Sequence, residues 1–194
     1  MASEPRLVLA SASPRRLDLL RQIGLTPDAV EAADLDEAPQ SDETPRQLAV
    51  RLAQAKATLV AARRPDAFVL GADTVVAVGR RVLPKAGDAA EVRACLRLLS
   101  GRAHRVLTGV AVATPGGRVA SRLVESRVHF KRLSDADVDA YLACGEGVGK
   151  AGGYAIQGRA GALVISLQGS YSGVVGLPLY ETANLLAGLG FKRP

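Results

Sequence analysis

The chain has 194 residues, of which 48% are hydrophobic and 4% aromatic, and its formal net charge is +6. This length predicts one domain, residues 1–194, with a core built mainly from Ala, Val and Leu. The two cysteines do not suggest a disulfide framework, and no apolar run suits a signal peptide or a membrane span. We therefore expect a cytoplasmic protein with no membrane partner. The basic residues are spread along the chain without a zinc-finger or RNP pattern, which argues against a stable nucleic-acid partner.

The first motif joins an apolar strand to a basic helix start. Residues 7–10 are apolar and predict a strand, and residues 11–16 read Ser-Ala-Ser-Pro-Arg-Arg before a leucine-rich helix. Arg15 and Arg16 therefore open a helix, where guanidinium groups and unpaired N–H groups both favour an anion. Open α/β sheets bind ligands at the carboxyl ends of their strands. The motif predicts an anion site, with a solvated helix start as the alternative.

A second helix is predicted after an acidic loop. Residues 34–37 read Asp-Leu-Asp-Glu, and Thr44 and Pro45 are typical of the N-cap and first position of a helix. Lys56 lies at the border of the apolar face that this helix presents (Leu48, Leu52, Ala55 and Leu59). Such a lysine either extends along apolar surface into water or reaches into a neighbouring polyanion site.

Asp73 is the strongest single catalytic candidate in the sequence. It lies within residues 68–78, a nearly continuous apolar run that Gly-Ala-Asp-Thr interrupts at positions 71–74. A continuous apolar run predicts a strand buried on both faces. A carboxylate inside such a strand is costly unless it is paired or coordinated. The alternative is an aspartate that ends the strand at a turn.

The second half of the chain predicts a hairpin and a glycine-rich section. Residues 106–113 and 118–130 read as antiparallel strands joined by a Pro-Gly-Gly turn, and residues 145–176 are rich in glycine. The two histidines, His104 and His129, lack metal-ligand spacing and are expected as half-buried polar residues at strand ends. The final helix, which follows Pro178, has leucines that could line a homodimer interface or lie in the core (Leu185, Leu186 and Leu189).

Taken in order, these segments resemble the Maf family of nucleoside triphosphate pyrophosphatases. The resemblance begins with residues 11–16 and runs almost to the end of the chain. Its further segments are Asp36-Glu37, residues 51–57, residues 71–76, Leu99-Ser100-Gly101, Thr108-Gly109-Val110, residues 150–158 and residues 175–179.

This resemblance implies both a fold and a reaction. The fold is a mixed α/β structure similar to the ITP pyrophosphatase superfamily, with an elongated central mixed sheet, flanking helices and two lobes around one nucleotide cleft. The reaction is hydrolysis of a nucleoside triphosphate to the monophosphate and pyrophosphate, with a divalent metal such as Mg²⁺ or Mn²⁺.

The resemblance also assigns roles to residues. Asp73 is the base that activates water, directly or through the metal, and Glu37 is its partner in metal binding. The cations that clamp the phosphates are Arg15, Arg16, Lys56 and Lys85. Ser11 and Ser13 complete the phosphate site. Stabilisation of developing negative charge by such groups is usually the largest catalytic contribution.

The resemblance also implies which nucleotide base the site accepts. Arg15, Thr74 and Gln157 occupy the positions that distinguish family members acting on dTTP and UTP from the 7-methyl-GTP branch. A glutamine both donates and accepts, which suits the O4 and N3 edge of thymine or uracil. We therefore expect hydrolysis of dTTP and UTP, and of modified pyrimidine nucleotides, which would limit misincorporation into nucleic acids. The alternatives are a 7-methyl-GTP or broad-specificity pyrophosphatase and a non-catalytic nucleotide-binding regulator of cell division.

Overall fold

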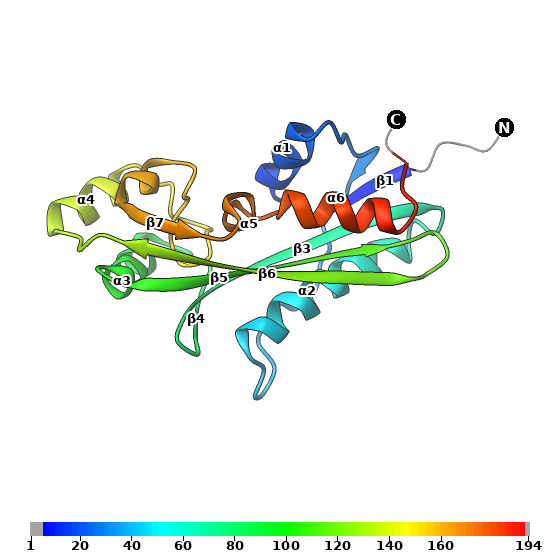
Figure 1. The fold of residues 1–194 in the computed structure, drawn as a ribbon. Helices are drawn as coiled ribbons and strands as arrows, with labels where there is room; N and C mark the ends of the chain where they lie inside the picture. Colours follow the sequence, from blue (N-terminus) through cyan, green and yellow to red (C-terminus); the bar gives the residue numbers. More distant parts are fainter. Residues whose placement is uncertain (1–5, 193–194) are drawn as a thin grey trace.

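The computed structural model describes residues 6–192 and has a mixed α/β fold around one seven-stranded sheet (Figure 1). The strands are β1 (Arg6–Ala10), β2 (Ala29–Val30), β3 (Ala67–Val78), β4 (Arg81–Leu83), β5 (Ala103–Ala113), β6 (Val119–Phe130) and β7 (Val164–Gln168). The helices are α1 (Pro14–Gln22), α2 (Pro45–Ala61), α3 (Ala89–Leu99), α4 (Asp135–Ala143), α5 (Tyr171–Val175) and α6 (Leu179–Gly188), with a 3₁₀ turn, η1, at Arg159–Leu163. No helix within residues 6–192 combines the length and the apolar character that crossing a membrane requires.

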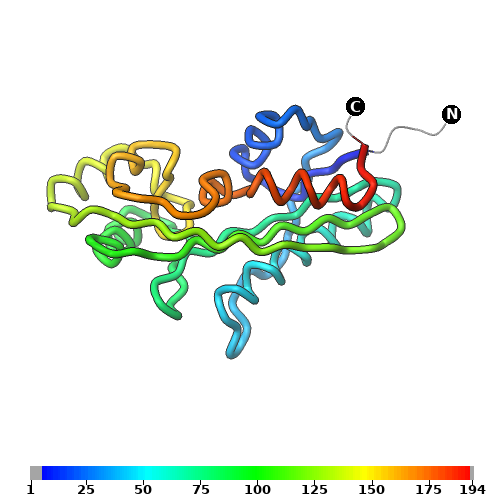
Figure 2. Tube along the Cα trace, viewed as in Figure 1, coloured from blue at the N-terminus to red at the C-terminus, as the bar shows by residue number. Residues whose placement is uncertain are grey.

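The strands follow the order β2-β1-β3-β5-β6-β7, and β4 pairs with residues 76–78 at the end of β3. β1 is parallel to both β2 and β3, whereas the other pairs are antiparallel. The long strands β3, β5 and β6 give the molecule its elongated shape, which the trace in Figure 2 also shows. The predicted fold class, an elongated mixed sheet with flanking helices, is confirmed.

Local signals account for several of these elements. The Thr44 hydroxyl accepts from the Gln47 N–H, and the Gln47 side chain accepts from the Thr44 N–H, so both cap α2. The Pro115-Gly116-Gly117 segment joins β5 to β6, as predicted. Residues 71–74, which interrupt the apolar run, continue the pairing of β3 with β5. Asp73 therefore lies inside the strand, and the alternative of an aspartate that ends the strand at a turn is wrong. The glycine-rich section contains η1, β7 and α5, which the sequence pattern did not predict.

Alternating residues of β3 pack against different helices. Phe68, Leu70 and Ala72 lie in one apolar cluster with residues of α1 and α6. Val75 and Ala77 lie with residues of α2, on the other face. Figure 1 accordingly shows α1 and α6 on one side of the sheet and α2 on the other.

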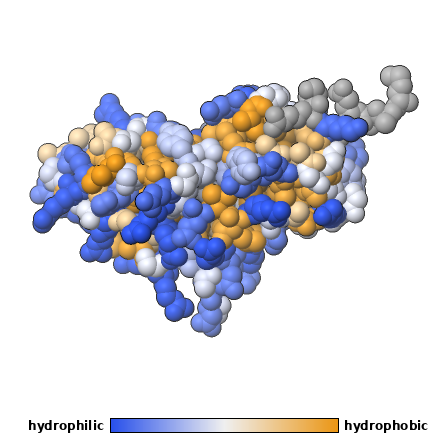
Figure 3. Space-filling model, viewed as in Figure 1, coloured by the Kyte–Doolittle hydropathy of each residue, from blue (hydrophilic) through white to orange (hydrophobic). Residues whose placement is uncertain are grey.

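In the space-filling view, hydrophilic residues cover the two projections at the lower edge, which are the β3–β4 hairpin and the loop before α2 (Figure 3).

The leucines of the final helix belong to the core. Leu185 and Leu186 are only 7% and 2% exposed, and Leu189 packs partly buried against the same cluster as α1 and β1. Of the two alternatives that the sequence left open for these leucines, the structure therefore shows the core position.

β3 has an unpaired stretch on one edge. β1 pairs with β3 as far as Gly71, and β4 pairs with it from Val76. The opposite edge of β3 pairs with β5 throughout this region. Within residues 6–192, Ala72–Val75 therefore lack a strand neighbour on the first edge. Side chains from both faces of β3 can reach the opening that this gap creates.

α2 lies close to the sheet, because Gly71 and Gly109 face it and leave room for its backbone. A Cβ added to Gly109 would lie 2.2 Å from the carbonyl oxygen of Ala49, and one added to Gly71 would lie 2.5 Å from that of Ala53. Any side chain at these positions would push the helix away from β3 and β5.

His104 is more deeply buried than the sequence suggested. It is 2% exposed, and its Nε2 atom lies 2.7 Å from the Tyr154 hydroxyl oxygen. The rings of His104, Phe130 and Tyr154 pack edge to face. The expectation of a half-buried position was wrong, because the hydrogen bond and the aromatic contacts allow the neutral imidazole to be buried. Burial lowers the pKa of His104 to about 4.

We expect Gly109→Ala to lower the free energy of unfolding by about 3 kcal/mol, because the added methyl group collides with the α2 backbone. Chemical denaturation measures this. Gly188→Ala is the control, since Gly188 is the last residue of α6 and a Cβ there meets nothing within 4 Å. It should not lower the free energy of unfolding. Equal stability of Gly109→Ala and the unchanged protein would contradict the close approach of α2.

We expect acid to destabilise the protein through His104. In the unfolded chain its pKa returns to 6.5, so between pH 6.5 and pH 4 the unfolded state binds a proton that the folded state does not. The free energy of unfolding should therefore fall as the pH is lowered across this window, by an amount on the order of 3 kcal/mol. Urea denaturation from pH 7 to pH 4 measures the fall, which should be smaller in His104→Gln because an amide does not titrate. An identical pH dependence in both proteins would contradict the prediction.

Candidate active site

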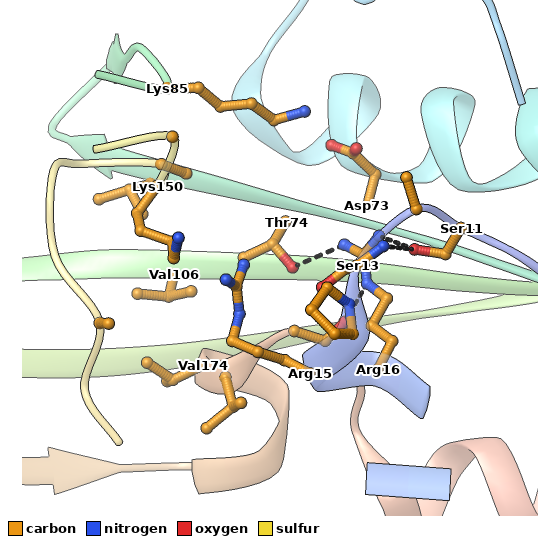
Figure 4. Close-up of a pocket in the computed structure, with 18 of the residues that line it drawn as sticks. Ser11, Ser13, Arg15, Arg16, Asp73, Thr74, Lys85, Val106, Lys150 and Val174 are labelled. Carbon is orange, nitrogen blue, oxygen red and sulfur yellow. Dashed lines mark hydrogen bonds between the residues drawn. The ribbon is translucent and has the colours of Figure 1, made fainter. Parts of the chain in front are cut away.

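A cavity of about 350 Å³ opens at the gap in the edge of β3. All the site residues expected from the sequence line it: Ser11, Ser13, Arg15, Arg16, Glu37, Lys56, Asp73, Thr74, Lys85 and Gln157. They come from the turn after β1, the start of α1, the loop before α2, α2 itself, β3, the loop after β4 and the segment before η1. The structure thus brings together every one of these residues, and Figure 4 shows several of them pointing into the cavity.

Two carboxylates and two lysines alternate at one side of the cavity. The Lys56 Nζ atom lies 2.6 Å from Asp73 Oδ1 and 2.5 Å from Glu37 Oε1. The second carboxylate oxygen of Glu37 contacts the Lys85 Nζ atom. Lys56 and Asp73 are only 6% and 3% exposed, whereas half of the Lys85 side chain is exposed. Lys56 therefore reaches the polar site rather than water, and each buried charge has a partner of opposite sign.

The two lysines keep Glu37 ionised. Burial acts to raise the pKa of Glu37, but hydrogen bonds from Lys56 and Lys85 outweigh burial and lower the pKa to about 2. A carboxylate with this pKa carries its negative charge at every physiological pH.

Arg16 connects three parts of the chain. Its Nε atom donates to the Gly176 carbonyl at 2.8 Å, and its terminal nitrogens donate to the Ser11 hydroxyl at 3.1 Å and the Thr74 hydroxyl at 3.4 Å. Burial lowers the pKa of Arg16, and the negative charge of Asp73 opposes this shift. The Arg16 guanidinium is thus held in place inside the cavity (Figure 4).

Thr74, which lines the cavity, contacts Thr108 on the neighbouring strand β5. The Thr74 and Thr108 hydroxyl oxygens lie 3.1 Å apart on paired strands, and the Thr108 hydroxyl donates to the Gly173 carbonyl at 2.7 Å. Because side chains alternate along a strand, Thr74 and Asp73 point to opposite faces of β3. The gap beside them lets both line the same cavity. The sequence reasoning assigned no role to Thr108, although the segment Thr108-Gly109-Val110 is part of the resemblance to the family.

Several lining residues had no role assigned to them from the sequence. They include Lys150, Tyr154 and residues 174–176 at the end of α5. Residues 150–154 read Lys-Ala-Gly-Gly-Tyr and belong to a segment that resembles the family, which was the signal available for Lys150. Figure 4 shows Lys150 and Arg15 extending into the cavity from different segments. Burial lowers the pKa of Arg15.

The carboxylates of this cavity fit a metal that is shared with phosphate. Within residues 6–192, no three His, Cys, Asp or Glu side chains converge as a complete metal site. Glu37 and Asp73 nevertheless both contact the Lys56 Nζ atom, so their oxygens can share one cationic centre. Proteins commonly bind Mg²⁺ through one or two carboxylates, with water and substrate phosphates as the other ligands. Glu37 and Asp73 match that donor set.

We expect Lys56→Met to lower the free energy of unfolding by about 3–5 kcal/mol, because it leaves the buried Asp73 carboxylate without its ammonium partner. Lys85→Met is the matched control, since the Lys85 side chain is half exposed and, in the part of the chain that the structure describes, Glu37 is its only carboxylate partner. It should cost about 1 kcal/mol or less. Denaturation of both variants at neutral pH tests the difference, and equal losses would show that the Lys56–Asp73 pair is not the stabilising contact.

Comparison with known proteins identifies the family of this chain. Residues 6–189 match the Maf-like protein family. The dTTP/UTP pyrophosphatase of Caulobacter vibrioides is 66% identical over 192 residues, covering 99% of this chain and 100% of the relative. The dTTP/UTP pyrophosphatase of Maricaulis maris is 64% identical over 187 residues, covering 96% and 89%. Among solved structures, the Ham1 protein of Staphylococcus aureus aligns with 64% of this chain and 71% of its own, at 16% identity and a TM-score of 0.44. The match to the family extends from β1 to the end of α6, and the chain therefore belongs to the Maf family.

Proposed function

We propose that this chain is a nucleoside triphosphate pyrophosphatase that hydrolyses dTTP and UTP to the monophosphate and pyrophosphate. The observation that carries this proposal is the buried Asp73 carboxylate, which lies beside Lys56 in a cavity that is also lined by Arg15, Arg16 and Lys85. Hydrolysis at the α-phosphorus needs a base for water and cations for the phosphate charge. The relatives of Caulobacter vibrioides and Maricaulis maris, both named dTTP/UTP pyrophosphatase, support the same reaction and substrates.

In this mechanism Asp73 accepts the proton of the attacking water. The water oxygen forms a bond to the α-phosphorus while the bond from that phosphorus to the β-phosphate bridging oxygen breaks, and pyrophosphate leaves with the electron pair. Lys85, Arg15 and Arg16 stabilise the charge on the phosphate oxygens. Ser11 and Ser13 line the same cavity and supply hydroxyl donors.

We further propose that Glu37 and Asp73 hold a divalent cation such as Mg²⁺ or Mn²⁺. When bound, it would polarise phosphate oxygens and lower the pKa of water. The low pKa of Glu37 supports this role, because a metal ligand must be deprotonated.

Base selection is assigned to Arg15, Thr74 and Gln157. All three line the cavity, and Gln157 is exposed at its rim. The Gln157 amide can donate to O4 of thymine or uracil and accept from N3–H, which a carboxylate cannot do. This favours pyrimidine triphosphates over the 7-methyl-GTP alternative. A non-catalytic regulator would not need a buried carboxylate beside the phosphate cations, so the Lys56–Asp73 pair favours an enzyme.

The remaining expectations concern the domain organisation, the oligomeric state and the location of the protein. We propose that residues 1–194 form one domain with two lobes around this cavity. The α1 and α6 cluster at one side and the α3 and α4 cluster at the other support it. A homodimer and a cytoplasmic location stay predictions.

We expect the purified protein with Mg²⁺ to release pyrophosphate from dTTP and UTP much faster than from dCTP, GTP or 7-methyl-GTP. Asp73→Asn should lower the turnover number by about 10²–10⁴-fold, because the amide cannot accept the proton. A coupled pyrophosphate-release assay over the nucleotide panel measures both effects.

Gln157→Glu is the companion variant for selectivity. It keeps the catalytic cluster and should lose activity with dTTP and UTP selectively, since a carboxylate cannot donate to O4. Turnover confined to 7-methyl-GTP would overturn the base assignment and keep the reaction. Nucleotide binding without turnover would overturn the enzyme and favour the regulator.

A further inference from the structure

Lys150 is a cation of the cavity that the mechanism above does not use. Its side chain lines the cavity, and its Nζ atom donates to the Val148 carbonyl at 3.2 Å. Within residues 6–192 it forms no ion pair with a carboxylate. Burial, together with the positive charge of Arg15, lowers the pKa of Lys150. The ammonium group is therefore partly desolvated without a counter-charge.

Arg15 is a second cation of the cavity that is partly desolvated without a counter-charge. No side chain of the described residues forms an ion pair with it, and burial lowers its pKa. Figure 4 shows the Arg15 and Lys150 side chains pointing toward one another across the cavity. This differs from the neighbouring cluster, where Glu37 and Asp73 balance Lys56 and Lys85. Two like charges that face each other in a partly buried space favour an anion between them.

The backbone fixes Lys150 relative to Lys85. The Ala86 N–H donates to the Lys150 carbonyl at 3.1 Å, and the Gly149 N–H donates to the Ala86 carbonyl at 2.7 Å. The Gly152 N–H donates to the Pro84 carbonyl at 3.0 Å, and Lys85 pairs with Ala151 in an isolated antiparallel bridge. The loops that carry Lys85 and Lys150 are thus joined side by side, and both lysines line one cavity.

We propose that Lys150 is a further substrate-binding residue, which together with Arg15 holds oxygen atoms of the triphosphate chain. This inference rests on the proposed function. A phosphate group, rather than the base, is the matching ligand because an ammonium group has three donors and no acceptor and cannot read the N3–H of a pyrimidine. The phosphate chain also supplies the negative charge that this part of the cavity lacks.

The test compares Lys150→Met, Lys150→Arg and the control Lys192→Met. Lys192 is exposed after α6 and does not line the cavity. Calorimetric titrations with dTTP and with inorganic tripolyphosphate, in the presence of a chelator, measure binding without turnover. Separate assays with Mg²⁺ and dTTP measure kcat and KM. The side chain of Lys150 makes one hydrogen bond and its backbone contacts persist in every variant, so all should fold, which thermal unfolding verifies.

We expect Lys150→Met to weaken the binding of both dTTP and tripolyphosphate by about tenfold or more, the loss typical of a charged hydrogen bond. KM should rise more than kcat falls. Lys150→Arg should restore most of the affinity because it keeps the charge, and Lys192→Met should behave as the unchanged protein.

Three results would overturn the inference. The first is an unchanged affinity of Lys150→Met for tripolyphosphate. The second is a loss of affinity for dTTP alone, which would assign Lys150 to the base. The third is the absence of tripolyphosphate binding by the unchanged protein. A failure of the proposed function is distinguishable, because the unchanged protein would then bind these anions without hydrolysing any nucleotide.

Discussion

The site depends on the short stretch of β3 that has a strand neighbour on only one edge. A strand that is paired on both edges separates the two faces of its sheet, so Asp73 and Thr74 could not line a common cavity. Here β1 ends at Ala10 and the chain turns into α1, while β4 joins the same edge only from Val76. The turn after β1 therefore brings Ser11 and the arginines to one side of the gap. The loop after β4 brings Lys85 to the other.

The charge arrangement depends in turn on the close approach of α2. Gly71 and Gly109 allow the helix backbone to lie directly on β3 and β5, and this brings Lys56 within hydrogen-bond distance of Asp73. An ammonium group has three N–H donors, and Asp73 and Glu37 take two of those on Lys56. Within residues 6–192 Lys56 has no third acceptor, and it lines the cavity, so a phosphate oxygen can accept its third N–H without separation of the buried ion pair. Separation would be costly, because it would leave an unpaired charge in the interior.

The sequence predicted what depends on local signals. The α2 cap, the hairpin after Ala113 and the importance of a carboxylate inside the apolar β3 run all follow from residues close together in the chain. The orientation of Arg16 does not, because it is set by Gly176, 160 residues away. The burial of His104 depends in the same way on Tyr154, 50 residues away. The gap in the edge of β3 was also unpredictable, since it arises from where two other strands end.

The segment 149–157 connects the part of the cavity assigned to the base with the part assigned to the phosphates. At one end, hydrogen bonds join Gly149 and Lys150 to the loop of Lys85. In its middle, the Ala155 N–H donates to the Tyr141 hydroxyl at 3.0 Å, and the Tyr154 hydroxyl contacts His104. Gln157, assigned above to base selection, follows directly. The segment cannot shift to accommodate a misfitting base without breaking these buried contacts and moving Lys85, so the fold favours rejection of such a base over adaptation to it.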